Sequence, residues 1–193
     1  MSNDAILQIL QDKTLDIKKV AAIYEENTNN LPIESMVAMN LSLRTSVYDS
    51  NLEKSDTMIA LLEQLATSKS MEARWAVAKN PHTPLLVLEN LAKDEVNLVR
   101  ALVATNANTP AKILEKFFND EKIVRDGLSG NGNTPLKLLT ILCKDTDKMV
   151  RLRVAENKAS SKAILEQLSF DSVEDVKKAA QKNLANQRTK EDA

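Results

Sequence analysis

A single pattern, close to V-R-x-x-V-A-x-N-x-x-T-P-x-x-x-L-x-x-L-x-x-D, returns about every 26 residues along this chain. Successive copies read EARWAVAKNPHTPLLVLENLAKD, LVRALVATNANTPAKILEKFFND, IVRDGLSGNGNTPLKLLTILCKD and MVRLRVAENKASSKAILEQLSFD. A fixed period of this length is typical of stacked helical units that share one continuous core. The repeat therefore predicts an all-α superhelical solenoid of about six to seven short helix-pair repeats, which form a single domain over residues 1–185.

The composition supports a soluble, globular, helical chain. The 193 residues are 43% hydrophobic and 27% charged, and only 3% are aromatic, which disfavours a β-sandwich. No apolar run approaches the roughly 20 residues that cross a bilayer. The residues from Met1 to Asp4 lack the basic region of a secretory signal, so we expect a cytoplasmic protein. The net charge of -1 provides no overall attraction to nucleic acid or anionic lipid.

A recurring basic residue sets the register of the first helix in each repeat. The members of this basic column are Lys18, Arg44, Arg74, Arg100, Arg125, Arg151 and Lys177. The long interval between Arg44 and Arg74 predicts an insertion of about four residues around 51–55. A second helix is predicted after each Thr-Pro pair, with threonine as the N-cap and proline at the first helical position. These pairs are Thr83-Pro84, Thr109-Pro110 and Thr134-Pro135, and Ser160-Ser161 replaces them in the next copy.

The ends of the chain depart from the pattern. Residues 3–12 predict an amphipathic helix capped by Ser2 or Asn3, and Leu31-Pro32 predicts the start of another. We interpret residues 1–70 as degenerate N-terminal capping repeats and 71–185 as the clear repeats. The polar segment 186–193 is expected to be a frayed tail.

The clear repeats resemble the variant leucine-rich repeat family, a bacterial class within the armadillo and HEAT-like helical solenoids. The match is carried by Val99-Arg100, Val103-Ala104, Asn106, Thr109-Pro110, Leu114 and Asp120 with their equivalents. The resemblance implies a right-handed superhelix of short helix pairs, in which one helix is partly 3₁₀. One type of member carries a cysteine cluster for an iron–sulfur centre. Cys143 is the only cysteine here, so we expect no cofactor and interpret this residue as packed.

The basic column allows two interpretations. Stacked cations at the roughly 10 Å spacing of packed helices would track a phosphate backbone, together with Lys112, Lys137 and Arg153. Alternatively, a ladder of ion pairs with aspartates ties each repeat to the next. Each candidate partner precedes its basic residue by five or six positions, namely Asp94, Asp120, Asp145 and Asp171.

Other recurring or unusual residues have mainly structural interpretations. The asparagine column lies where first helices end, and its amides either satisfy free carbonyls or adopt the left-handed conformation. Its members are Asn80, Asn106, Asn131, Asn157 and Asn183. The run containing Gly127, Gly130 and Gly132 is open to three interpretations: a loosened helix, a hinge or contact surface, or a small-anion site. The only histidine, His82, is interpreted as a solvated loop residue.

The sequence shows no catalytic or metal-binding pattern, so we predict a non-catalytic scaffold for protein–protein interaction. Positions that vary between copies are where solenoids place binding surfaces. We therefore select Trp75, Leu152 and Arg153 as partner-binding residues, although Trp75 is equally compatible with a place in the core. The alternative is a nucleic-acid-binding solenoid that uses the basic column.

Overall fold

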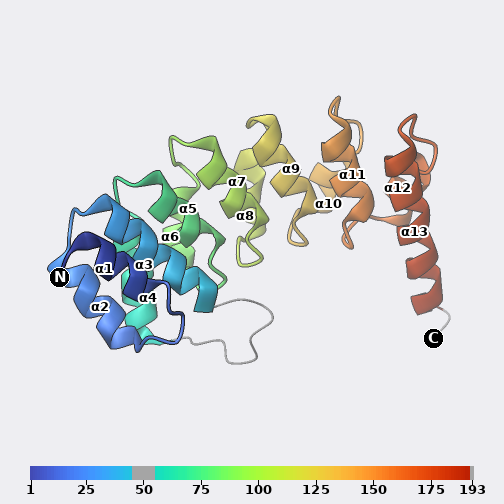
Figure 1. The fold of residues 1–193 in the computed structure, drawn as a ribbon. Helices are drawn as coiled ribbons and strands as arrows, with labels where there is room; N and C mark the ends of the chain where they lie inside the picture. Colours follow the sequence, from blue (N-terminus) through green and yellow to red (C-terminus); the bar gives the residue numbers. More distant parts are fainter. Residues whose placement is uncertain (45–54, 192–193) are drawn as a thin grey trace. The chain divides into compact units, whose positions relative to one another are not determined.

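The chain is described here by a computed structural model, which covers residues 1–44 and 55–191. Every regular element in these two stretches is a helix (Figure 1). The predicted all-α repeat fold is therefore confirmed. Contacts between residues divide the chain into two compact units, Met1–Asn108 and Thr109–Ala193, which we describe separately.

The first unit contains alternating first and second helices. The first helices α1, α3, α5 and α7 pack side by side in chain order, and the second helices α2 and α4 also pack together. Each helix pair therefore occupies two layers, as expected for a helical repeat. The bounds are α1 (Asn3–Leu10), α2 (Ile17–Glu26), α3 (Leu31–Arg44), α4 (Asp56–Leu65), α5 (Met71–Lys79), α6 (Leu85–Leu91) and α7 (Asn97–Thr105).

The second unit continues the same alternation. Its first helices α9, α11 and α13 pack in sequence, and α12 packs against both α11 and α13. The partly 3₁₀ helix implied by the family resemblance is present, because α8 continues directly into the 3₁₀ turn η1. The bounds are α8 (Ala111–Leu114), η1 (Glu115–Phe117), α9 (Lys122–Gly130), α10 (Leu136–Leu142), α11 (Lys148–Glu156), α12 (Lys162–Leu168) and α13 (Glu174–Glu191).

The apolar positions of the repeat form the core, as predicted. In the second helices the buried residues are Val87, Leu88 and Leu91, then Ile113, Leu114 and Phe117, then Leu138, Leu139 and Leu142, and finally Ile164, Leu165 and Leu168. Cys143 is packed as expected, with 2% of its surface exposed. Burial raises the pKa of the Cys143 thiol, which disfavours the reactive thiolate.

The predicted register is wrong for the first two members of the basic column. Lys18 lies in α2, which is a second helix, and Arg44 is the last residue of α3. Arg74 and the later members are instead the fourth residues of first helices, and Glu34 holds that place in α3. The spacing of basic residues gave the wrong register because α3 is 14 residues long, whereas α5 has 9. Of the predicted insertion, residues 51–54 lie outside the described residues.

The last helix is longer than the repeat pattern predicted. Helix α13 runs from Glu174 to Glu191, so the segment expected to fray after Ala185 is helical as far as Glu191. The reason is local, because this segment lacks glycine and proline and contains good helix formers. The predicted extent of a single solenoid domain over residues 1–185 stays a prediction.

The Thr-Pro pairs close the first helix rather than open the second. The hydroxyl of Thr83 donates to the Val77 carbonyl at 2.6 Å, and Thr134 donates to Leu128 at the same distance. The proline itself stands in the N-cap position, with no side-chain cap. The predicted threonine N-cap is therefore wrong, since the hydroxyl is held by a buried carbonyl of the preceding helix end.

The serine pair of the next repeat separates the two roles. Ser160, in the place of threonine, donates to the Val154 carbonyl at 2.6 Å. Ser161, in the place of proline, accepts a hydrogen bond from the Ile164 amide at 3.4 Å and so caps α12. Serine and proline at this second position thus start the helix by different means, a side-chain cap and a fixed φ.

The asparagine column links neighbouring repeats. Asn157 Nδ2 donates to the carbonyls of Ser129 and Asn131 at 2.7 and 2.9 Å, at the end of the preceding first helix. Its Oδ1 accepts from the Ala159 amide at 2.8 Å. The prediction that these amides satisfy free carbonyls is confirmed. The left-handed alternative is wrong, since Asn157 is extended with φ -68° and ψ 125°. Asn106 and Asn183 donate to the equivalent carbonyls of the repeats before them.

Helix α3 interrupts this column. Asn40 lies inside α3 and still donates backward, to the carbonyls of Leu10 and Asp12 at 2.7 and 3.0 Å. However, α3 continues four residues past Asn40 to Arg44, so its carbonyls near Asn40 are used within the helix. Asn80, the next member, is 1% exposed, and its Nδ2 has no hydrogen-bond partner within the part of the chain that the structure describes.

This difference predicts unequal effects of the same substitution. Asn157→Ala is expected to lower the free energy of unfolding by about 2–3 kcal/mol, because it leaves two helix-end carbonyls without a donor. Among the described residues, Asn80→Ala removes one side-chain hydrogen bond, which the His82 amide donates to Asn80 Oδ1, and we expect a loss of about 0.5–1 kcal/mol. Urea denaturation followed by circular dichroism measures both. Equal losses would show that the amide does not hold the repeats together.

Candidate functional site

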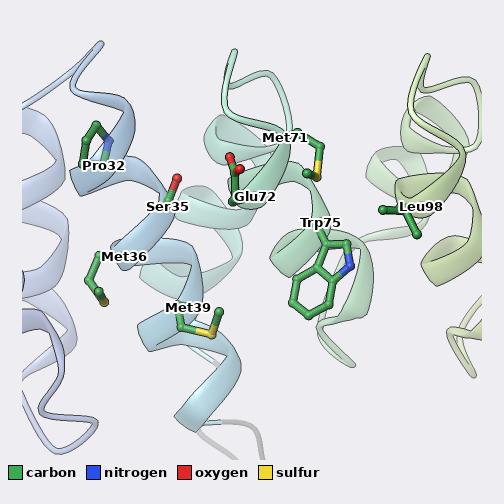
Figure 2. Close-up of a pocket in the computed structure, with 8 residues that line it drawn as sticks. All are labelled: Pro32, Ser35, Met36, Met39, Met71, Glu72, Trp75 and Leu98. Carbon is green, nitrogen blue, oxygen red and sulfur yellow. The ribbon is translucent and has the colours of Figure 1, made fainter.

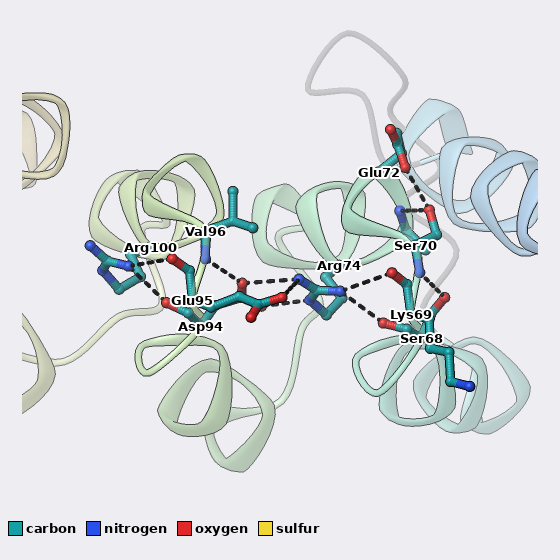
Figure 3. A network of polar contacts seen from close by, with 10 residues as sticks. Ser68, Lys69, Ser70, Glu72, Arg74, Asp94, Glu95, Val96 and Arg100 are labelled. Atoms are coloured by element: carbon teal, nitrogen blue, oxygen red, sulfur yellow. Dashed lines mark hydrogen bonds and ion pairs between the residues drawn. The ribbon is translucent and has the colours of Figure 1, made fainter.

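Arginines and aspartates form a ladder along the first helices. Nε of the arginine lies 2.6 Å from the aspartate in Arg74–Asp94, 2.8 Å in Arg125–Asp145 and 2.7 Å in Arg151–Asp171. Nη2 of each arginine donates to the other carboxylate oxygen, so these are bidentate pairs. Figure 3 shows the first of them. Each pair joins a helix to the loop before the next first helix, which confirms a ladder that ties one repeat to the next.

The partner of each arginine is not the aspartate that precedes it. Asp145 gives its carboxylate to Arg125 of the preceding repeat and only its backbone carbonyl, at 2.8 Å, to Arg151. The same carboxylate accepts from the Asp147 amide at 2.8 Å, which fixes the turn. The arginine side chains are only 13%, 22% and 15% exposed for Arg74, Arg125 and Arg151. Their guanidinium groups are therefore occupied within the fold.

The ladder shifts the acidities of its members. The hydrogen bond from Arg151 lowers the pKa of the Asp171 carboxyl below its ordinary value. For Asp145, burial works to raise the pKa, but the hydrogen bonds from Arg125 and the Asp147 amide outweigh it, and the pKa is lowered. Both shifts favour the ionised, paired form in the folded state.

The predicted partner-binding residues lie in different units. Trp75 is half-buried on α5 in the first unit, and Lys79 Nζ lies 5.4 Å from the centroid of its ring. Leu152 is half-buried on α11 in the second unit. Its neighbour Arg153 is exposed, with Asp126 at 3.6 Å and Glu156 at 3.1 Å.

Trp75 lines an apolar groove of about 400 Å³ on the first helices of the first unit. In Figure 2 its indole ring lies between the side chains of Met39 and Leu98. Three of the chain's six methionines line the groove, and Glu72 is the only charged residue among the lining side chains. The lining residues are Pro32, Ser35, Met36 and Met39 from α3, Met71, Glu72 and Trp75 from α5, and Leu98 from α7.

A second pocket, of about 290 Å³, lies beside the N-terminal end of α3 and contains Glu34. Glu34 is 6% exposed, accepts from the Asn29 amide at 2.9 Å and accepts from the Ser68 hydroxyl. Asn29 has φ 68°, a left-handed conformation that asparagine tolerates. Burial, and then the charge of Glu34, raise the pKa of the nearby Tyr24 hydroxyl. The repeat pattern does not reveal this pocket, because it places Arg44, and not Glu34, at the position that arginine holds in later first helices.

His82 and the glycine run line neither the groove around Trp75 nor the pocket at Glu34. His82 is half-buried in the loop between α5 and α6. The described glycines have no positive φ, and a Cβ added to Gly130 would meet Arg153 Cδ at an ordinary 3.6 Å. The glycine run therefore does not adopt a strained anion-binding turn. Among the described residues, no three His, Cys, Asp or Glu side chains are grouped as a metal site requires.

Comparison with known proteins identifies the fold. No family model matches the chain, and no curated protein matches it. A solved structure described as a leucine-rich repeat variant with a novel repetitive protein structural motif is similar, with a TM-score of 0.50 and 20% sequence identity. The match covers 93% of this chain and 80% of that one. This chain therefore has a leucine-rich repeat variant fold. None of its described helices combines the length and hydropathy that crossing a bilayer requires.

The ladder predicts a specific dependence of stability on pH. The folded pKa of Asp171 is lowered, so its contribution is complete above the unfolded pKa of about 3.9 and is lost as the pH falls through the folded value. Asp171→Asn is expected to lower the unfolding free energy by about 1.5–3 kcal/mol at neutral pH, and the difference from wild type should shrink below about pH 4.

Urea denaturation at several pH values measures this difference. Asp175→Asn is a matched control, because Asp175 is an exposed carboxylate on the next helix. A loss for Asp171→Asn that stays constant down to the lowest pH would contradict the role assigned to the pair.

Proposed function

We propose that this protein is a non-catalytic scaffold that binds a protein or peptide partner, with the groove around Trp75 as its principal contact. The supporting observation is the groove itself, an apolar hollow of about 400 Å³ with a half-buried tryptophan in its lining. Tryptophan is enriched among residues that dominate binding energy. We also propose a cytoplasmic location.

The chemistry of the groove favours a bulky apolar side chain as the anchor of the partner. Met39 and Leu98 are 39% and 41% exposed, so apolar surface remains open to be covered. Methionine side chains are flexible and polarisable, and they adapt to ligands of differing shape. The backbone beneath them is regular helix, which limits the ordering cost of binding.

Leu152 and Arg153 remain proposals for a further contact on the second unit. Leu152 is half-buried, and the exposed guanidinium of Arg153 lies near two carboxylates rather than in the ladder. An extended partner that also used this region would gain avidity without requiring strong contacts at either place.

Trp75→Ala is expected to weaken peptide binding at least about tenfold, as for other buried aromatic anchors. Dodecapeptides selected from a random display library against the wild-type chain serve as probes. Because Trp75 is the only tryptophan, its fluorescence reports occupancy of the groove directly in the wild-type chain. Calorimetry compares affinities across variants.

Leu86→Ala is the matched control, since Leu86 is 72% exposed on α6, outside the groove. We expect the selected peptides to bind this variant as they bind wild type, and to carry bulky apolar residues. Peptides that bound wild type and Trp75→Ala with equal affinity would rule out the groove as the binding site.

Nucleic-acid binding through the basic column is a less favoured alternative. Such binding needs cations that are free to approach phosphates. The guanidinium groups of Arg74, Arg125 and Arg151 are instead bidentate to aspartates and mostly covered. Lys137 lies 2.7 Å from Glu115, so this cation is also paired.

A titration of duplex DNA by fluorescence anisotropy tests this alternative. We expect no detectable binding at low salt, because Arg74, Arg125 and Arg151 of the ladder are already paired with aspartates. Binding that weakened steeply between two salt concentrations would favour the nucleic-acid function instead.

A further inference from the structure

Glu34 is a buried carboxylate without a cationic partner. Its side chain belongs to a residue that is 6% exposed, and among the described residues no Lys or Arg forms an ion pair with it. Lys69 at the rim of the pocket is exposed and likewise makes no such pair. Glutamates are almost never fully buried unless paired, because an uncompensated buried charge is costly. This arrangement points to a cation that binds from outside the unit.

The hydrogen bonds of Glu34 leave acceptor capacity in the pocket. An ionised carboxylate offers about four lone-pair sites. The Asn29 amide and the Ser68 hydroxyl use two of them and hold the carboxylate in one orientation. The space beside it, about 290 Å³, is also lined by the aromatic side chain of Tyr24. A carboxylate and an aromatic ring together suit a planar guanidinium.

The same helix position elsewhere in the chain holds a guanidinium. Glu34 is the fourth residue of α3, as Arg74 is of α5 and Arg151 of α11. Ser68 holds the place of the ladder aspartate, since it precedes Arg74 by six residues and its Oγ accepts from the Ser70 amide at 3.0 Å. Asp94 accepts from the Val96 amide in the same way. In α3 the carboxylate of Glu34 therefore stands where the later first helices have the guanidinium of a ladder arginine.

We propose that the pocket at Glu34 binds an arginine side chain of the partner. This inference rests on the proposed function, because the same partner would place an apolar side chain in the groove around Trp75. Helix α3 contributes to both places, with Leu31 and Glu34 in the pocket and Pro32, Ser35 and Met36 in the groove. The first unit has 10 basic and 14 acidic residues, a formal charge of -4, which also favours a basic partner.

The experiment is a titration of ¹⁵N-labelled full chain with N-acetyl-arginine amide, followed by amide chemical shifts. We expect saturable shifts of the Asn29, Ser68 and Lys69 amides, and none with the neutral isostere N-acetyl-citrulline amide. Glu34→Gln removes the charge and keeps one acceptor oxygen, for the Asn29 amide, while its Nε2 group can donate to the Ser68 hydroxyl oxygen. We expect it to weaken arginine binding by about tenfold or more, the effect of one charge-assisted contact.

Two further variants separate binding from folding. Glu34→Arg supplies a guanidinium from the chain itself and is expected to abolish the shifts. Glu63→Gln removes an exposed carboxylate of α4 that lines neither the groove nor the pocket, and it should leave them unchanged. Citrulline shifts as large as those of arginine, or equal arginine affinity for wild type and Glu34→Gln, would overturn the proposal. A loss of circular dichroism in Glu34→Gln would reassign the carboxylate to helix capping and would equally overturn it.

Peptide affinities of the Trp75→Ala and Glu34→Gln chains, measured by calorimetry, keep this result distinct from the test of the groove. Peptides that lose affinity in Trp75→Ala but keep it in Glu34→Gln would preserve the protein-binding function while removing the arginine site. If N-acetyl-arginine amide shifts the amides of the pocket but no peptide binds at the groove around Trp75, the proposed function is wrong. The pocket would then be a cation site without a known partner.

Discussion

The structure depends on one kind of hydrogen bond, from an asparagine side chain to the helix-end carbonyls of the preceding repeat. A helix leaves its last carbonyls unpaired, and a short helix has a large share of its backbone at its ends. Asn157 satisfies two such carbonyls, while its own oxygen holds the following turn. Because the donor comes from the next repeat, a helix end in this pattern does not have all its carbonyls satisfied without that repeat. The repeats are therefore interdependent, beyond the apolar surface that they share.

The ladder and the hydroxyl bonds act on the same junctions. Arg151 connects its helix to Asp171 near the next first helix, and Ser160 ties the following loop to the Val154 carbonyl. Where a first helix continues past its asparagine, a longer side chain four residues later also donates to a carbonyl of the preceding repeat. Gln187 Nε2 donates to the Ser160 carbonyl at 2.9 Å, and Arg44 donates to the equivalent carbonyl of Leu15. The same backbone acceptors are satisfied by different residues at the two ends of the chain.

The fold could be predicted from the sequence because every copy of the repeat shows the same apolar core positions and the same residues at its helix ends. The buried residues of α10 and α12 were predicted, as was the asparagine column. Spacing alone could not give the direction of the hydrogen bonds, so the threonine of Thr83-Pro84 was assigned to the wrong helix. The predicted register of the basic column was wrong before residue 71, because α3 is longer than the other first helices of the first unit. The groove and the Glu34 pocket both involve α3, so the candidate site lay where the pattern carried least information. Only Trp75 was found in advance, because it is chemically conspicuous.

The overrun of α3 has a consequence for how such a protein changes during evolution. Between α9 and α12 each repeat has matching hydrogen-bond donors and acceptors at both edges. A gene segment that encodes one repeat can therefore be copied or deleted, and the new neighbours still fit. The helix pair beginning with α3 has no such freedom, because none of its described residues accepts a hydrogen bond from the Asn80 side-chain amide. Length can therefore vary in the second unit while the groove around Trp75 and the Glu34 pocket, both in the first unit, stay unchanged.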